Sequence, residues 1–158
     1  MIKITKPLIQ KALIAGFFSA FTIGVLTVLT YKSTLGYFIA GSFGSSMVLL
    51  FGFPESPFAQ PKNVFFGHLI TALVGILFVN FIPLPIYINI ALAVGIGIFL
   101  MIIFDITHPP AGDNPIIVII ASTSYEYLIN PIIFGSLIII LLAIFINRLI
   151  LKKNYPQK

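Results

Sequence analysis

The chain has no cysteine and very few charged residues. None of its 158 residues is a cysteine, which excludes disulfide bonds and metal sites built from thiolates. Charged residues make up 8% of the chain and hydrophobic residues 59%, whereas soluble globular domains carry about 25% charged residues. The composition therefore excludes an ordinary soluble protein and indicates an integral membrane protein, with no room for a separate soluble domain.

The basic residues gather at the two ends of the chain. Next to membrane spans, such residues report orientation, so we expect no nucleic-acid partner. The N-terminal group and the C-terminal group are Lys3, Lys6 and Lys11, and Arg148, Lys152, Lys153 and Lys158.

Long apolar runs predict an all-α polytopic bundle. At roughly 20 residues per crossing, five runs are long enough to span a membrane. They cover residues 12–30, 34–53, 64–82, 86–104 and 131–151, with the second interrupted at 41–46. Between the last two runs lies a polar, proline-rich tract that continues into the short apolar piece 116–121.

The basic residues decide whether this tract crosses the membrane. The positive-inside rule places both ends in the cytoplasm, which requires an even number of crossings. With six crossings, eight of the nine Lys and Arg residues are cytoplasmic and only Lys32 is outside. We therefore expect one transmembrane domain, residues 1–158, in a bacterial inner membrane with both termini cytoplasmic.

A shift of 68 positions aligns the chain with itself. It places Gly44 on Gly112 and Gly67 on Gly135, although aliphatic matches arise by chance in so Leu/Ile-rich a sequence. The halves, about 12–83 and 86–151, would each have three spans and would be inverted relative to each other. This pattern predicts that the second and fifth helices are broken at their glycines.

The tract 105–115 is the main candidate for function. Irregular backbone at membrane depth survives only where protein or a water-filled cavity surrounds it, and ionisable residues there usually mark a pathway. The adjacent Pro109 and Pro110 forbid a continuous helix.

Several blocks in one order resemble a known family. They are Gly41-Ser42-Phe43-Gly44-Ser45-Ser46, Pro54-Glu55-Ser56-Pro57, Gln60-Pro61-Lys62-Asn63, Gly67-His68 and His108-Pro109-Pro110. Over about residues 36–140 the chain resembles the HPP family of integral membrane proteins. Because members in plastids and cyanobacteria are associated with nitrite transport, the resemblance implies a small-anion transporter. This chain departs from the family motif at Asp113, where family members usually have a small residue.

The two breaks predict an anion site. Half-helices restarting at about Ser45 and Asp113 would offer free N–H groups and positive dipole ends, which bind anions without a basic side chain. A monovalent anion such as nitrite, with or without a proton, would suit them. The predicted site residues are Ser42, Phe43, Gly44, Ser45, Ser46, His108, Pro109, Pro110, Ala111, Gly112, Asp113 and Asn114.

Four of the candidate residues could have a purely structural role instead of a role in transport. Gly44 could serve close helix packing instead. His108 could contact the anion, carry a proton, satisfy a freed carbonyl or face the cytoplasm. His68 could line the pathway or bond another helix. Asp113 could cap the restarting half-helix or titrate.

The expected function is transport by a channel or a carrier, without metal or cofactor. Because a single bundle of 158 residues is small for a transporter, we expect a homo-oligomer in the lipid bilayer. The alternatives are a non-transporting scaffold for a partner and an intramembrane enzyme using His108 with Asp105 or Asp113. No nucleophile–base pattern or metal-ligand set supports the enzyme.

Overall fold

The computed structural model describes residues 4–157, and these residues form helices without any strand. Four helices are long and apolar enough to cross a membrane. They are α1 (Lys6–Lys32), α3 (Pro61–Phe81), α4 (Ile86–Ile103) and the run Leu128–Ile150, which comprises η4 (Leu128–Ile133), α6 (Phe134–Ile144) and η5 (Phe145–Ile150). The prediction of an all-α membrane protein is confirmed.

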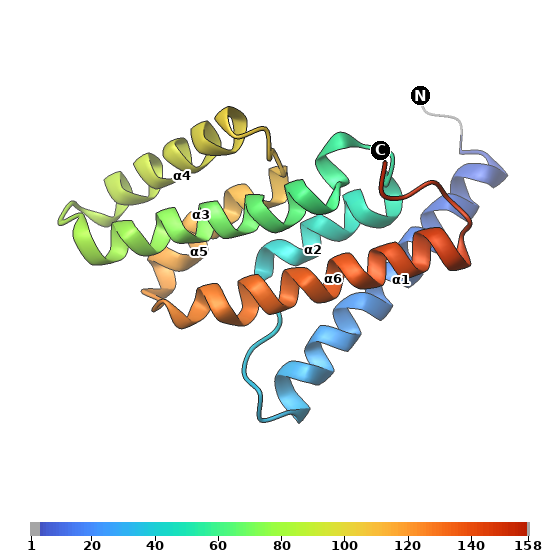
Figure 1. Cartoon of the computed structure of the whole chain (residues 1–158), viewed down its shortest axis with the longest axis horizontal. Helices are drawn as coiled ribbons and strands as arrows, with labels where there is room; N and C mark the ends of the chain where they lie inside the picture. Colours follow the sequence, from blue (N-terminus) through green and yellow to red (C-terminus); the bar gives the residue numbers. More distant parts are fainter. Residues whose placement is uncertain (1–3, 158) are drawn as a thin grey trace.

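Two further helical segments are short. α2 (Gly41–Met47) continues into η1 (Val48–Gly52), and the 3-10 helix η3 (Pro109–Asp113) leads into α5 (Asn114–Ala121). At about 1.5 Å per residue, each spans about two-thirds of a hydrocarbon core about 30 Å thick. Both begin near the middle of the bundle and run toward opposite ends (Figure 1). The prediction of six helical crossings is not confirmed, because four helices within residues 4–157 have the required length.

The chain is interrupted before each short helix. The predicted break at Gly44 is wrong in position, since Gly44 lies inside α2 and residues 35–40 before it are non-helical. The second interruption covers residues 104–108, and Gly112 lies in the 3-10 turn that follows. Proline forces its preceding residue toward extended backbone, and His108 accordingly has φ −133° and ψ 97°.

Two glycines let the central long helices approach these interruptions. A Cβ on Gly67 of α3 would lie 2.9 Å from the His108 Cβ and 3.1 Å from the Ile106 carbonyl oxygen. A Cβ on Gly135 of α6 would lie 2.5 Å from the Phe43 ring and would collide with the Phe38 carbonyl oxygen. Each glycine therefore packs directly against irregular backbone.

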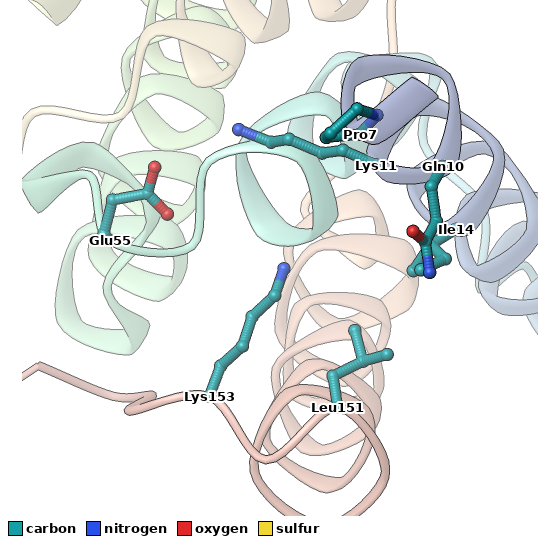
Figure 2. A pocket seen from close by; sticks show the side chains of 7 residues that line it. All are labelled: Pro7, Gln10, Lys11, Ile14, Glu55, Leu151 and Lys153. Atoms are coloured by element: carbon teal, nitrogen blue, oxygen red, sulfur yellow. The ribbon is translucent and has the colours of Figure 1, made fainter. Parts of the chain in front are cut away.

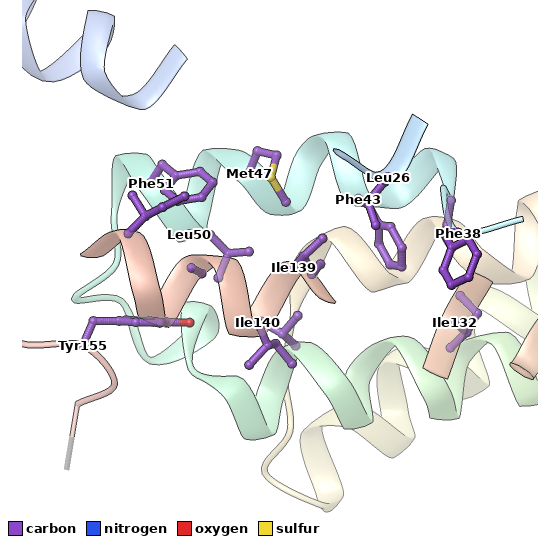
Figure 3. Close-up of a cluster of buried hydrophobic side chains, with 14 of the residues drawn as sticks. Leu26, Phe38, Phe43, Met47, Leu50, Phe51, Ile132, Ile139, Ile140 and Tyr155 are labelled. Carbon is purple, nitrogen blue, oxygen red and sulfur yellow. The ribbon is translucent and has the colours of Figure 1, made fainter. Parts of the chain in front are cut away.

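The largest hydrophobic core lies between α1, α2–η1 and α6. Its fully buried members include Leu26, Phe43, Leu50 and Ile139 (Figure 3). The C-terminal tail adds Tyr155, whose hydroxyl donates to the Ala59 carbonyl at 2.8 Å in η2 (Pro57–Ala59). In this core α1 contacts α2, η1 and α6, while α3 packs against α4, α5 and α6.

We expect Gly135→Ala to destabilise the protein by about 1–3 kcal/mol, the usual cost of overpacking. The added methyl group meets a backbone carbonyl, which cannot rotate away as a side chain can. Gly95→Ala in α4 is the matched control, because a Cβ there meets nothing within 4 Å. Thermal unfolding in detergent, followed by circular dichroism, compares the two; equal melting temperatures would contradict the packing described here.

Candidate functional site: a buried polar cluster

A cluster of fully buried polar side chains lies where the two short helices begin. Its members come from α2, α3, α5 and the residue preceding η3. Two of them, His68 and Thr71, lie near the middle of the 21-residue α3, which places the cluster at mid-depth in the bundle. The polar cluster consists of Ser42, Ser46, His68, Thr71, His108 and Asn114.

The Ser46 hydroxyl lies between the two imidazoles of the chain. Its oxygen is 3.0 Å from His68 Nε2 and 2.8 Å from His108 Nε2. His108 Nδ1 lies 2.7 Å from the Phe58 carbonyl oxygen. Because a carbonyl only accepts, Nδ1 must donate, and Nε2 of neutral His108 must accept. The neutral His108 ring therefore takes a hydrogen bond from Ser46.

Asn114 closes the other side of the polar cluster. Its Nδ2 lies 3.1 Å from His68 Nδ1, 3.1 Å from the His68 carbonyl oxygen and 3.0 Å from Thr71 Oγ1. Its Oδ1 accepts from the Ser42 hydroxyl at 2.7 Å. The amide nitrogen thus has three acceptors for two hydrogens.

The polar cluster contains hydroxyl, amide and imidazole groups and no carboxylate. Asp105 pairs with Lys62 at 3.4 Å on the exposed surface, and Asp113 is also exposed. Among residues 4–157, no group of three or more His, Cys, Asp or Glu side chains could hold a metal ion. The groups gathered here can donate hydrogen bonds without repelling an anion.

The predicted site residues divide into two sets. Phe43, Pro110 and Ala111 are buried beside the polar cluster members, and the Phe43 ring lies edge-on to His68 with centroids 5.0 Å apart. Residues on the other side of the short helices are open: Gly44, Ser45, Pro109 and Asp113 are exposed and Gly112 is partly exposed. Asp113 occupies the N-cap position of α5 but makes no side-chain cap hydrogen bond.

Backbone donors are fewer than the sequence suggested. Pro109 and Pro110 carry no N–H, and the Ala111 N–H already donates to the His108 carbonyl oxygen at 2.9 Å. Two functional groups were missed, Thr71 and the Phe58 carbonyl. Thr71 could have been found, since it follows His68 by three residues and so lies on the same helical face.

A cavity of about 380 Å³ lies at the end of the bundle near both termini, where two lysines face one carboxylate. Burial lowers the pKa of Lys153 below its ordinary value; Glu55 opposes this effect and Lys11 adds to it. The cavity is lined by Pro7, Gln10, Lys11, Ile14, Glu55, Leu151 and Lys153 (Figure 2).

Comparisons with known proteins identify the family. Two transmembrane proteins of Dictyostelium discoideum are 34% and 32% identical to the chain over 142 residues, which is 84% of this chain. The match covers 46% and 50% of the relatives, so the chain spans about half of their length. No solved structure matches. Residues 4–156 match the family described as "HPP, transmembrane region", and the chain therefore belongs to this family of membrane proteins.

Proposed function

We propose that the protein transports a small monovalent anion, nitrite being the candidate that the family resemblance suggests. The observation that carries this proposal is the polar cluster at mid-depth, where two short helices begin. Buried polar groups are costly in a membrane and usually mark a substrate or ion pathway. Interrupted helices that meet at mid-depth are the usual site of substrate binding in transporters.

The chemistry of the polar cluster favours an anion over a cation. Ser42, Ser46 and Asn114 supply hydroxyl and amide donors, and no carboxylate lies among them. The cavity near the termini adds Lys11 and Lys153 against Glu55, an excess of positive charge that attracts anions. An anion entering the polar cluster would replace the hydrogen bonds that its members now make to one another.

We also propose that the two halves are inverted repeats. In each half, the extended segment and its short helix would together make one passage through the membrane, giving six passages in all. Contacts at the two central glycines support the repeat, because a shift of 68 positions maps one set onto the other. Gly67 meets the Ile106 carbonyl and the Ala111 side chain, and Gly135 meets the Phe38 carbonyl and the Phe43 side chain.

Six passages with cytoplasmic termini give a direct labelling prediction. The chain has no cysteine, so single cysteines can be introduced without a background signal. A cysteine replacing Lys32 should react with an impermeant maleimide in intact cells, and cysteines replacing Lys62 or Lys153 should react only after the membrane is permeabilised. External labelling at Lys153 would rule out this topology.

Transport itself is tested by anion uptake into proteoliposomes. We expect Ser42→Ala to slow uptake about tenfold, because it removes one buried donor worth about 1–1.5 kcal/mol. Ser45→Ala is the matched control, since Ser45 lies on the exposed side of the same helix. Nitrite, nitrate, formate and chloride are compared, with protein-free liposomes subtracted.

Equal uptake in folded Ser42→Ala and Ser45→Ala proteins would show that the polar cluster is not part of the transport pathway. Absence of uptake for all four anions would favour a scaffold role.

We propose further that a second copy of the chain covers the exposed side of the short helices. Asp113 adjoins Asn114 and so lies at mid-depth, yet it is exposed. Gly112, which precedes Asp113, and Gly44 in α2 both face open space within the single chain. A carboxylate and short, polar helix ends cannot face hydrocarbon without a large cost, whereas small residues allow close approach of another helix.

Gly44→Leu should therefore dissociate the oligomer while leaving each chain folded. The leucine meets nothing within its own chain but would collide with a copy packed on this face. Gly95→Leu, on the exposed surface of α4, is the control and should leave the oligomer intact. Native mass spectrometry measures both, and an unchanged oligomer in Gly44→Leu would place the interface elsewhere.

A further inference from the structure

We infer that His68, Ser46 and His108 can take up one proton that the three groups share, and that the transported anion moves together with this proton. The shared proton follows from the hydrogen-bond geometry alone, whereas its coupling to an anion rests on the proposed function. The two rings lie 4.9 Å apart, centroid to centroid, with the Ser46 hydroxyl between them.

One arrangement of hydrogens satisfies the neutral cluster. His108 donates from Nδ1 to the Phe58 carbonyl and accepts at Nε2 from Ser46. Ser46 gives its only hydrogen to His108 rather than to the more distant Ser42 carbonyl oxygen at 3.2 Å, so it accepts from His68 Nε2. His68 Nδ1 is left as an acceptor and takes one hydrogen from Asn114. Each group therefore donates to the next one in a single direction, from Asn114 toward the Phe58 carbonyl.

An added proton passes through the same bonds without leaving a donor unpaired. If it arrives at His68 Nδ1, the hydrogen on His68 Nε2 moves to Ser46, and the Ser46 hydrogen moves to His108 Nε2. His108 is then the imidazolium, and neutral His68 carries its hydrogen on Nδ1, facing Ser42 Oγ at 3.4 Å. One proton enters and each atom keeps its normal valence.

The one spare acceptor around the Asn114 amide nitrogen makes this rearrangement possible. When His68 Nδ1 gains a hydrogen, the Asn114 amide loses that acceptor. It still has the His68 carbonyl oxygen at 3.1 Å and Thr71 Oγ1 at 3.0 Å for its two hydrogens. A second proton would place two positive charges on adjacent rings, which like-charge repulsion opposes.

The surrounding charges leave the shared proton without a fixed counter-ion. Neither α2–η1 nor η2 nor α5 carries an ionisable side chain. The segments that adjoin these elements carry the exposed Lys62–Asp105 pair, Asp113 and Glu55, and the tail adds the uncharged Tyr155, which bonds to Ala59. Within residues 4–157 none of these groups bonds to either imidazole. An anion held by Ser42 and Asn114 would therefore supply the missing negative charge.

Nuclear magnetic resonance of ¹⁵N-histidine-labelled protein tests the shared proton directly, because the chain has only two histidines. Near neutral pH we expect His108 as the Nδ1–H tautomer and His68 as the Nε2–H tautomer. On acidification one proton should bind per chain, and His68 should change to the Nδ1–H tautomer in the same step. Ser46→Ala should uncouple the two rings, whereas Ser45→Ala should behave as wild type.

Two independent titrations in the wild type, or a coupled titration that survives in folded Ser46→Ala, would overturn the shared proton. A cluster that takes up no proton before it unfolds would overturn it as well.

Coupling is tested with nitrate and chloride in proteoliposomes whose membrane potential is clamped by potassium and valinomycin. These anions do not cross bilayers as neutral acids, so any proton movement reflects the protein. One anion with one proton is electroneutral, so uptake should follow an inward proton gradient and ignore the potential. Uptake that follows the potential and ignores the proton gradient would overturn coupling while leaving transport intact. Absence of uptake of nitrate and chloride here, and of nitrite and formate in the uptake assay above, would overturn transport and with it the coupling. The resonance measurements would then test the shared proton by themselves.

Discussion

The structure depends on one constraint: peptide groups that leave a helix inside a membrane must be enclosed by protein. The chain leaves helical geometry before each short helix, and the last residues of each interruption, 38–40 and 106–108, are buried or partly buried. Each time, a long helix approaches closely enough to cover the exposed backbone, and it can do so only because Gly135 or Gly67 presents no side chain there. The arrangement of α3 and α6 at the centre of the bundle follows from this requirement.

Enclosing the interruptions also brings the polar side chains together. Ser46 and His108 are 62 positions apart in sequence, yet their side chains lie 2.8 Å apart because both short helices begin beside α3. Every member of the polar cluster finds a partner within it, which is what a low-dielectric interior demands of buried polar groups. Packing and chemistry at this site therefore have a common origin.

The sequence predicts the helical membrane class and one interruption well. Pro109 and Pro110 mark the second interruption, because they remove donors and constrain His108. The first has no such marker, and Gly44 misled the placement since a glycine on an exposed helix face needs no break. Sequence reasoning found five of the six polar cluster members. It could not separate them from exposed neighbours such as Ser45, because which side of a short helix is covered depends on tertiary packing.

The three-residue η2 is held at two successive carbonyls by different parts of the chain. The Phe58 carbonyl accepts from His108, and the Ala59 carbonyl accepts from Tyr155 in the C-terminal tail. The two carbonyls belong to consecutive peptide groups, which are separated only by the φ and ψ rotations of Ala59. The C-terminal tail and the polar cluster at the centre of the bundle are therefore joined through one short turn, with the Tyr155 phenol bonded to one carbonyl and the His108 imidazole to the carbonyl before it.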